Sequence, residues 1–138
     1  MIDKCKTVFS KIYSIELGLH LFESAKTKFA QYSHIQILHG DSSLLLQDVL
    51  KNIDRPALFW LDGHYSEGIT AKGELNTPIV SELTHIFKHS EKHVILIDDA
   101  RCFVGKDDYP TLNELKNLMK NDNRYKNFFV ENDIIRIF

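Results

Sequence analysis

Apolar and polar residues alternate along the chain in short blocks that predict strands and helices in turn. Five mostly apolar residues, Ala57 to Leu61, have no periodic polar break and predict a strand buried on both faces. A second apolar run, His93 to Ile97, predicts another strand of this kind. Both runs end abruptly in polar residues, as expected at the carboxyl ends of strands in open α/β sheets, where ligands bind.

The rest of the chain divides into the same two kinds of element. Runs rich in β-branched or aromatic residues predict strands, and apolar residues at helical spacing predict amphipathic helices. The further strands are expected at Lys11 to Glu16, His34 to Leu38, Phe128 to Glu131 and Ile134 to Phe138. The helices are expected at Leu19 to Gln31, Ser42 or Ser43 to about Ile53, Pro78 to about His89, and Thr111 to about Lys120.

Three local signals mark the ends of these elements. Thr77-Pro78 is typical of an N-cap followed by proline at the first helical position. Thr111 and Glu114 have the spacing of a capping box. Asn132-Asp133 predicts a tight hairpin between the last two strands.

Strands separated by helices predict a parallel sheet with helices on both faces, which is a doubly wound α/β domain. The closing hairpin adds one antiparallel strand, which we expect at the edge of the sheet. A chain of 138 residues is long enough for one domain with a real core and too short for two. We therefore interpret residues 1–138 as a single domain without repeats or linkers.

Composition excludes several classes of function. A formal net charge of −2 with 43% hydrophobic residues is ordinary for a globular protein and gives no reason to expect a nucleic-acid partner. No apolar run approaches the roughly 18 residues that predict a membrane span. Cys5 and Cys102 match no metal-binding spacing, so we expect reduced thiols in a cytoplasmic protein.

Three carboxylates follow two strands that should be neighbours. Asp62 comes directly after the first buried strand, and Asp98 and Asp99 come after the second. Grouped carboxylates repel unless a hard cation such as Mg²⁺ neutralises them, and that cation can polarise a hydroxyl for deprotonation. The alternative is that Asp62 or Asp99 caps a turn or a helix.

Other polar residues at strand ends have two interpretations each. His64 is a candidate general base or a surface histidine. Glu16 is a candidate acceptor for two ribose hydroxyls or the start of a turn. Asp41 is a candidate acceptor for the exocyclic amine of a nucleobase or part of a strand-to-helix turn. Arg101 is a candidate ligand for a carboxylate or phosphate or a structural partner of Asp99.

Four segments carry a family resemblance when they are taken together and in order. They are Tyr-Ser-Ile-Glu at 13–16, Leu-His-Gly-Asp-Ser at 38–42, Phe-Trp-Leu-Asp-Gly-His-Tyr-Ser at 59–66 and Ile-Leu-Ile-Asp-Asp-Ala-Arg at 95–101. This set resembles the class I S-adenosylmethionine-dependent methyltransferases, with their Rossmann-like fold. Within that superfamily it is most similar to the metal-assisted O-methyltransferases of the catechol type and to small bacterial relatives.

The resemblance implies roles for particular residues. Glu16 would bind the ribose of S-adenosylmethionine, Asp41 and Ser42 would lie along the adenine, and Asp62 would adjoin the cofactor. Three aspartates, Asp62, Asp98 and Asp99, fall where the catechol type holds Mg²⁺, although the third ligand there is usually an asparagine. Asp62 and His64 would be the catalytic residues.

The family's first strand and its glycine-rich turn have no counterpart, since no glycine precedes Gly18. Residues 1–10 would supply at most the end of the following helix. We therefore expect the sheet to lack its central strand, between the strands that end at Glu16 and Asp62. The alternatives are an N-terminally truncated form of a longer methyltransferase, direct pairing of those two strands, or a homo-oligomer or partner chain that fills the position.

Two functions are expected on these grounds. The first is methyl transfer from S-adenosylmethionine to a hydroxyl of a small polar substrate, with assistance from a divalent metal. The second is a catalytically inactive or truncated methyltransferase-like domain that binds a nucleotide or a partner chain. We expect the segments 67–76 and 102–109 to shape the substrate pocket.

Overall fold

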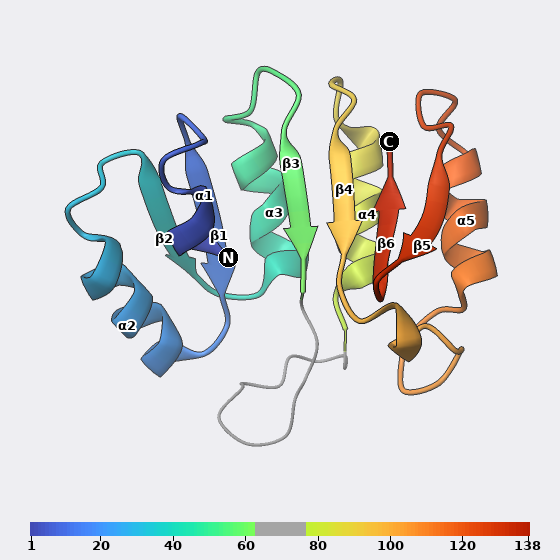
Figure 1. Ribbon diagram of the computed structural model, residues 1–138, viewed down its shortest axis with the longest axis horizontal. Coiled ribbons are helices and arrows are strands. Elements are labelled where there is room, and N and C mark those ends of the chain that lie inside the picture. The colour runs from blue at the N-terminus through green and yellow to red at the C-terminus, as the bar shows by residue number, and fades with distance from the viewer. Residues whose placement is uncertain (63–76) are drawn as a thin grey trace.

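The computed structural model describes residues 1–62 and 77–138, in which strands and helices alternate as an α/β fold (Figure 1). The predicted residue His64 and the segment 67–76 lie outside the described residues. The elements are α1 (Ile2–Cys5), β1 (Ile12–Glu16), α2 (Leu19–Phe29), β2 (Ile35–His39), α3 (Ser42–Leu50), β3 (Leu58–Leu61), α4 (Ile79–Lys88), β4 (Val94–Ile97), the 3-10 helix η1 (Ala100–Cys102), α5 (Leu112–Lys120), β5 (Phe128–Glu131) and β6 (Ile134–Ile137).

The predicted strands form two sheets. β1 and β2 make a parallel pair, and a four-stranded sheet has the order β3-β4-β6-β5. β3 and β4 are parallel, whereas β6 runs antiparallel to both β4 and β5. The hairpin was therefore predicted correctly, but the expectation that its antiparallel strand lies at the edge is wrong. β6 pairs with β4 and leaves β5 outermost, and this second partner buries Ile135 and Ile137 of β6.

Direct pairing of the strands that end at Glu16 and Asp62 does not occur, since β1 and β3 belong to different sheets. Figure 1 shows their arrowheads pointing the same way on either side of the interruption. The core nevertheless continues beneath it. Tyr13 and Ile15 of β1 pack against the buried cluster that contains Phe59 and Leu61 of β3. α3, which packs on β1 and on α4, bridges the two sheets.

One face of the four-stranded sheet is buried and the other is not. Phe59, Ile95 and Ile137 occupy neighbouring positions on one face, and all three are buried. On the opposite face Leu58 and Val94 are neighbours and are 41% and 42% exposed. The prediction that the strand at 57–61 is buried on both faces is therefore wrong for one face, which has no covering layer among the described residues.

Two of the three local end signals fold as predicted; the third is displaced by one residue, because α4 begins at Ile79 with Pro78, and not Thr77, as its N-cap. The Thr111 hydroxyl accepts the Glu114 N–H (3.2 Å) and the Thr111 N–H donates to the Glu114 carboxylate (2.7 Å), which completes the capping box. The Thr77 hydroxyl accepts the Ile79 N–H (3.3 Å) at the start of α4. Asn132 and Asp133 have φ angles of 53° and 63°, as a type I′ hairpin turn requires.

A buried histidine joins the amino ends of β3 and β4 to the end of α4. His93 Nδ1 accepts the Ala57 N–H (3.1 Å), so its Nε2 carries the proton that is shared with His89 Nδ1 (2.9 Å). Its main-chain N–H donates to the Tyr125 hydroxyl (3.1 Å). The His93 side chain is only 1% exposed. Burial, followed by the proximity of His89 and Arg124, lowers the pKa of His93 to about 4.

This network predicts a loss of stability in mild acid. The pKa of His93 is about 4 in the folded chain, against 6.5 for an unperturbed histidine, so the unfolded state binds more protons between these values. Lowering the pH from 7 to 5 should therefore reduce the free energy of unfolding by about 2 kcal/mol through this group. Urea unfolding at both pH values measures the loss, and NMR titration of the ring measures the pKa directly. A His93→Gln chain should lack this contribution, whereas exposed His20→Gln should keep it; a ring that titrates near 6.5 would contradict the prediction.

Two further observations bear on the sequence expectations. Cys5 and Cys102 are both free thiols. Within residues 1–62 and 77–138, no helix combines the length and the apolar character needed to cross a bilayer.

Candidate functional site

The polar residues predicted at strand ends gather along one side of the fold. Glu16 ends β1, Asp41 follows β2, Asp62 follows β3 and Asp98 follows β4. β1 is parallel to β2, β3 is parallel to β4, and the two pairs point the same way (Figure 1). The four carboxylates therefore lie at the carboxyl ends of four parallel strands, on the side where α/β sheets bind ligands.

Glu16 lies next to the interruption between the sheets. Its Oε1 accepts the main-chain N–H of Gly18 (3.2 Å), the residue that precedes α2. This bond holds the carboxylate at the turn after β1. The turn interpretation of Glu16 is thus correct for one oxygen, and a carboxylate has a second oxygen for a ligand.

Asp41 caps α3. Its Oδ1 accepts the Ser43 N–H (2.8 Å), which satisfies one of the donors at the start of the helix. Gly40 before it has φ 146°, and a Cβ at this position would lie 2.8 Å from Leu45 Cδ1. The strand-to-helix turn that the sequence offered as one alternative for Asp41 is therefore present. Ser42, the first residue of α3, faces Glu82 of α4 and acts to lower the pKa of its carboxyl.

Asp62, Asp98 and Asp99 line one small cavity at the ends of β3 and β4, together with Thr77 and Tyr109. The cavity has a volume of about 10 Å³. Asp98 Oδ1 accepts the Asp99 N–H (2.9 Å). Asp99 itself is in the left-handed region, at φ 57°, which turns the chain sharply after β4. The sequence thus correctly placed these three residues at one end of the sheet.

Arg101 neutralises the third of these carboxylates. Its Nη1 lies 2.7 Å from Asp99 Oδ1 and also pairs with the Asp133 carboxylate in the hairpin turn. The Arg101 N–H donates to Asp133 Oδ1 (2.8 Å), so the arginine fastens η1 to the β5–β6 turn. The structural interpretation of Arg101 is correct.

No three histidine, cysteine or acidic side chains within residues 1–62 and 77–138 are grouped closely enough to hold a metal ion. Asp99, the predicted third ligand, is paired with Arg101. The Mg²⁺ site at Asp62, Asp98 and Asp99 therefore stays a prediction, and the described residues as folded do not supply a three-carboxylate ligand set.

Tyr109 belongs to this site although the sequence gave it no role beyond its segment. Its ring packs edge to face against Phe103 (5.3 Å between centroids) and it lines the acidic cavity. Burial, with smaller contributions from Cys102, Asp99 and Asp62, raises the pKa of Tyr109 to about 12. The phenol therefore stays protonated at neutral pH and presents a hydroxyl at the acidic end of the sheet.

Glu82 is the second residue that sequence analysis missed. It lies on the inner face of α4, between Ile79 and Ile86, and is 4% exposed. Burial, and to a smaller extent the Asp41 carboxylate, raises the pKa of Glu82 to about 7, while Ser42 acts to lower this pKa. The Oε2 atom of Glu82 is buried and has no hydrogen-bond partner among the described residues. A charged residue in the apolar stripe of a helix was the available signal.

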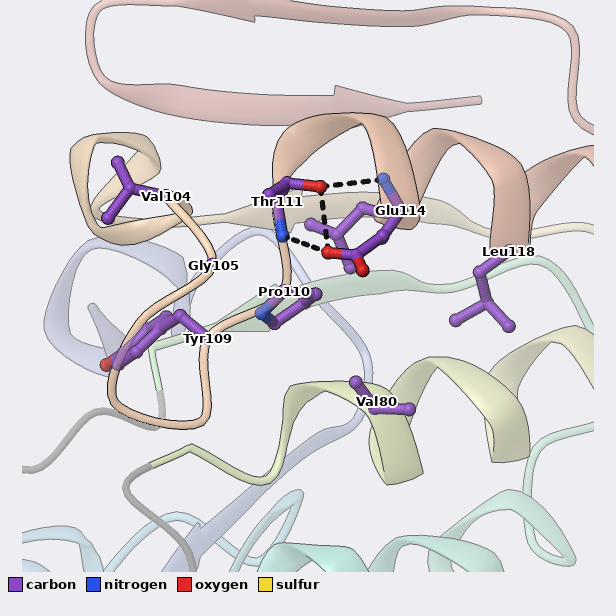
Figure 2. Close-up of a pocket in the computed structure, with 9 residues that line it drawn as sticks. Val80, Val104, Gly105, Tyr109, Pro110, Thr111, Glu114 and Leu118 are labelled. Carbon is purple, nitrogen blue, oxygen red and sulfur yellow. Dashed lines mark hydrogen bonds between the residues drawn. The ribbon is translucent and has the colours of Figure 1, made fainter.

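A larger groove lies on the other side of Tyr109, between α4 and the start of α5 (Figure 2). It has a volume of about 560 Å³ and is open and mainly apolar, with Val80, Val104 and Leu118 on its walls. Figure 2 shows that its carboxylate, Glu114, is engaged in the capping box. Of its polar side chains, Thr111 and Glu114 bond to each other and Tyr109 also lines the acidic cavity, so the strand ends, which gather more polar residues, are the better candidate.

Comparison with known proteins does not assign the chain to a class. No family model matches it, and a search of curated proteins found no match. What the fold defines is an α/β protein with parallel strand pairs and an antiparallel C-terminal hairpin. The chemistry of the site has to be argued from its own residues.

Proposed function

We propose that the chain is an S-adenosylmethionine-dependent methyltransferase domain that transfers a methyl group to a hydroxyl of a small polar substrate. The observation that carries the proposal is the position of Glu16 and Asp62. They end the two strands that flank the interruption, where the strand order turns from β1 and β2 on one side to β3 and β4 on the other. Such a switch point is where open α/β sheets bind nucleotide-like ligands.

The strand order gives further support. In a complete doubly wound sheet, the strands numbered along the chain lie side by side in the order 3-2-1-4-5. If strand 1 is left out, strands 2 and 3 lie on one side of a vacancy and strands 4 and 5 on the other. Here β1 and β2 take the places of strands 2 and 3, and β3 and β4 take the places of strands 4 and 5. The doubly wound architecture inferred from the sequence is thus part of the proposal. It places the cofactor across the vacancy, with its nucleoside toward β1 and β2 and its reacting end toward β3 and β4.

Each residue has a task in this proposal. Glu16 accepts two ribose hydroxyls, and the turn at Asp41 and Ser42 lies along the adenine. The cofactor, when bound, supplies an electrophilic methyl group on a positively charged sulfur. Asp62 helps to orient the substrate, whose hydroxyl oxygen takes the methyl group and releases its proton to His64, the candidate base. The protonated Tyr109 hydroxyl donates a hydrogen bond to the substrate.

Calorimetric titration with S-adenosylhomocysteine tests this proposal. We expect binding, and we expect Glu16→Gln to weaken it by about 10- to 100-fold, because a charged acceptor contributes about 1.5–3 kcal/mol. Glu23→Gln, on the exposed side of α2, is the matched control and should bind as the native chain does. Repeating the titration with Mg²⁺ and with a chelator tests the predicted metal separately.

Two results would count against the proposal. Equal affinity of the Glu16→Gln and native chains would remove Glu16 from the site. Absence of binding by a chain shown to be folded would favour the second function, a methyltransferase-like domain without catalysis that binds a partner. The unpaired edges of β1 and β3, as the described residues leave them, are the observation that favours this second function.

A further inference from the structure

Two side chains of α4 contact the first residues of α3, next to the turn proposed to lie along the adenine. The two helices pack against each other. His85 Nε2 donates to the Ser43 carbonyl oxygen (3.1 Å), and Glu82, three residues earlier in α4, faces Ser42. The start of α3 is therefore held from α4 through two titratable groups.

Glu82 is buried at this contact with one carboxyl oxygen left over. The residue is 4% exposed, and its Oε2 has no hydrogen-bond partner among the described residues. The charged group that faces it from the turn before α3 is Asp41, which is itself acidic. Burial, with a smaller contribution from Asp41, raises the pKa of Glu82 to about 7, so its carboxyl gains and loses a proton around neutral pH.

The elements packed around Glu82 present few other polar groups among the described residues. Asp41 and Ser42 face it from the start of α3, and His85 lies one turn further along α4. The inner faces of β3 and β4, which share the core with α4, carry apolar residues: Phe59, Leu61, Ile95 and Ile97. The proton on Glu82 therefore acts mainly on the turn at Asp41 and Ser42.

The protonation state of Glu82 determines what the Ser42 hydroxyl can do. A hydroxyl has one hydrogen to donate and two lone pairs that accept, whereas an ionised carboxylate can only accept. Beside ionised Glu82, the Ser42 hydrogen is directed at the carboxylate, which is how Ser42 acts to lower the pKa of Glu82. A protonated Glu82 can instead donate to Ser42 Oγ, and this leaves the serine hydrogen for another acceptor. The ring nitrogens of adenine are acceptors of this kind.

We propose that Glu82 is a positioning residue that sets the direction of the hydrogen bond at Ser42, so that Ser42 donates to the adenine of S-adenosylmethionine when Glu82 is protonated and not when it is ionised. The inference rests on the proposed function, in which Ser42 lies along the adenine. It predicts that affinity for the cofactor falls as the pH rises through neutrality. The loss should be roughly 3- to 10-fold, which corresponds to one neutral hydrogen bond.

The first test is calorimetric titration with S-adenosylhomocysteine at pH 6 and pH 8. The native chain should bind roughly 3- to 10-fold more weakly at pH 8. Glu82→Gln removes the titrating group and Ser42→Ala removes the hydroxyl, so both should lose this difference. Ser42→Ala should also bind at pH 6 about as weakly as the native chain does at pH 8. Exposed Glu23→Gln is the matched control and should keep the native difference.

Two results of this titration would overturn the inference. One is equal affinity of the native chain at the two pH values. The other is a difference between pH 6 and pH 8 that is as large in Glu82→Gln or in Ser42→Ala as in the native chain, because another group would then be responsible.

The second test uses NMR of the chain without a ligand, which separates this inference from the proposed function. The side-chain carboxyl carbon of Glu82, assigned by its loss in Glu82→Gln, should titrate near pH 7, and the Ser42 amide should shift with the same midpoint. His85→Gln should keep the Ser42 shift, which excludes His85 as its cause. A Ser42 amide that does not shift, or that shifts equally in Glu82→Gln, would overturn the inference. The expected shifts in a folded chain that binds no S-adenosylhomocysteine at either pH would contradict the proposed function and support the proton-dependent contact between Glu82 and Ser42.

Discussion

Replacing Ile95 by alanine is expected to lower the free energy of unfolding by about 2–5 kcal/mol, the range for deleting most of a buried aliphatic side chain. Ile95 lies in β4 between Phe59 of β3 and Ile137 of β6, and it is fully buried. The cavity would open at the centre of the four-stranded sheet, where paired strands on both sides restrict relaxation. Urea unfolding measures the loss.

Val94→Ala is the matched control for this prediction. Val94 precedes Ile95 in the same strand but is on the exposed face, so its truncation should cost less than about 1 kcal/mol. Equal losses in the two chains would contradict the assignment of the buried face. If Ile95→Ala does not fold, Ile95→Val, with an expected loss of about 0.5–1.5 kcal/mol, keeps the comparison measurable.

Replacing Glu82 by glutamine is expected to stabilise the chain increasingly as the pH rises. The pKa of Glu82 is about 7 in the folded state, against 4.5 for an unperturbed glutamate, so folding is opposed once the carboxylate ionises. A group with a raised pKa contributes stability below its unfolded value and loses it as the pH rises through its folded value. Between pH 4 and pH 8 the stability of the Glu82→Gln chain relative to the native chain should therefore increase by about 3 kcal/mol.

The comparison isolates Glu82 from the groups that face it. Ser42 and Asp41 at the start of α3, and His85 on α4, are present in both chains, so their own titration largely cancels. Glu23→Gln, on the exposed side of α2, should give a difference that does not change with pH. A constant difference for Glu82→Gln as well would mean that Glu82 is ionised in the folded chain at no cost.

Much of the candidate site was predictable because polar residues interrupt apolar runs. The pattern placed Glu16, Asp41, Asp62 and Asp98 after strands, and the ends of parallel strands share one side of the fold. The sequence offered caps and turns as alternatives, and Asp41 does cap α3. Glu82 and Tyr109 were missed because their importance comes from burial, which depends on the segments that pack against them.

The helix cap of α5 and the turn of the β5–β6 hairpin were equally predictable, because both depend on residues that are close together in the sequence. The capping box at Thr111 and Glu114 spans three residues, and the hairpin at Asn132 and Asp133 needs only two residues that tolerate positive φ. By contrast, Arg101 has two partners. It pairs with Asp99, two residues before it in the chain, and with Asp133 in the hairpin turn. The second contact exists only because β6 pairs with β4.

The sequence by itself determined the alternation of strands and helices, the end of each strand to within one residue, and the acidic character of the ends of β1 to β4. These properties arise from periodicity and turn chemistry within about ten neighbouring residues. Only the tertiary structure decided that β6 lies inside the sheet, that one face of β3 and β4 is exposed, and that β1 and β3 do not pair. Strand order and burial depend on contacts between segments far apart in the chain, and local patterns do not encode which segments meet.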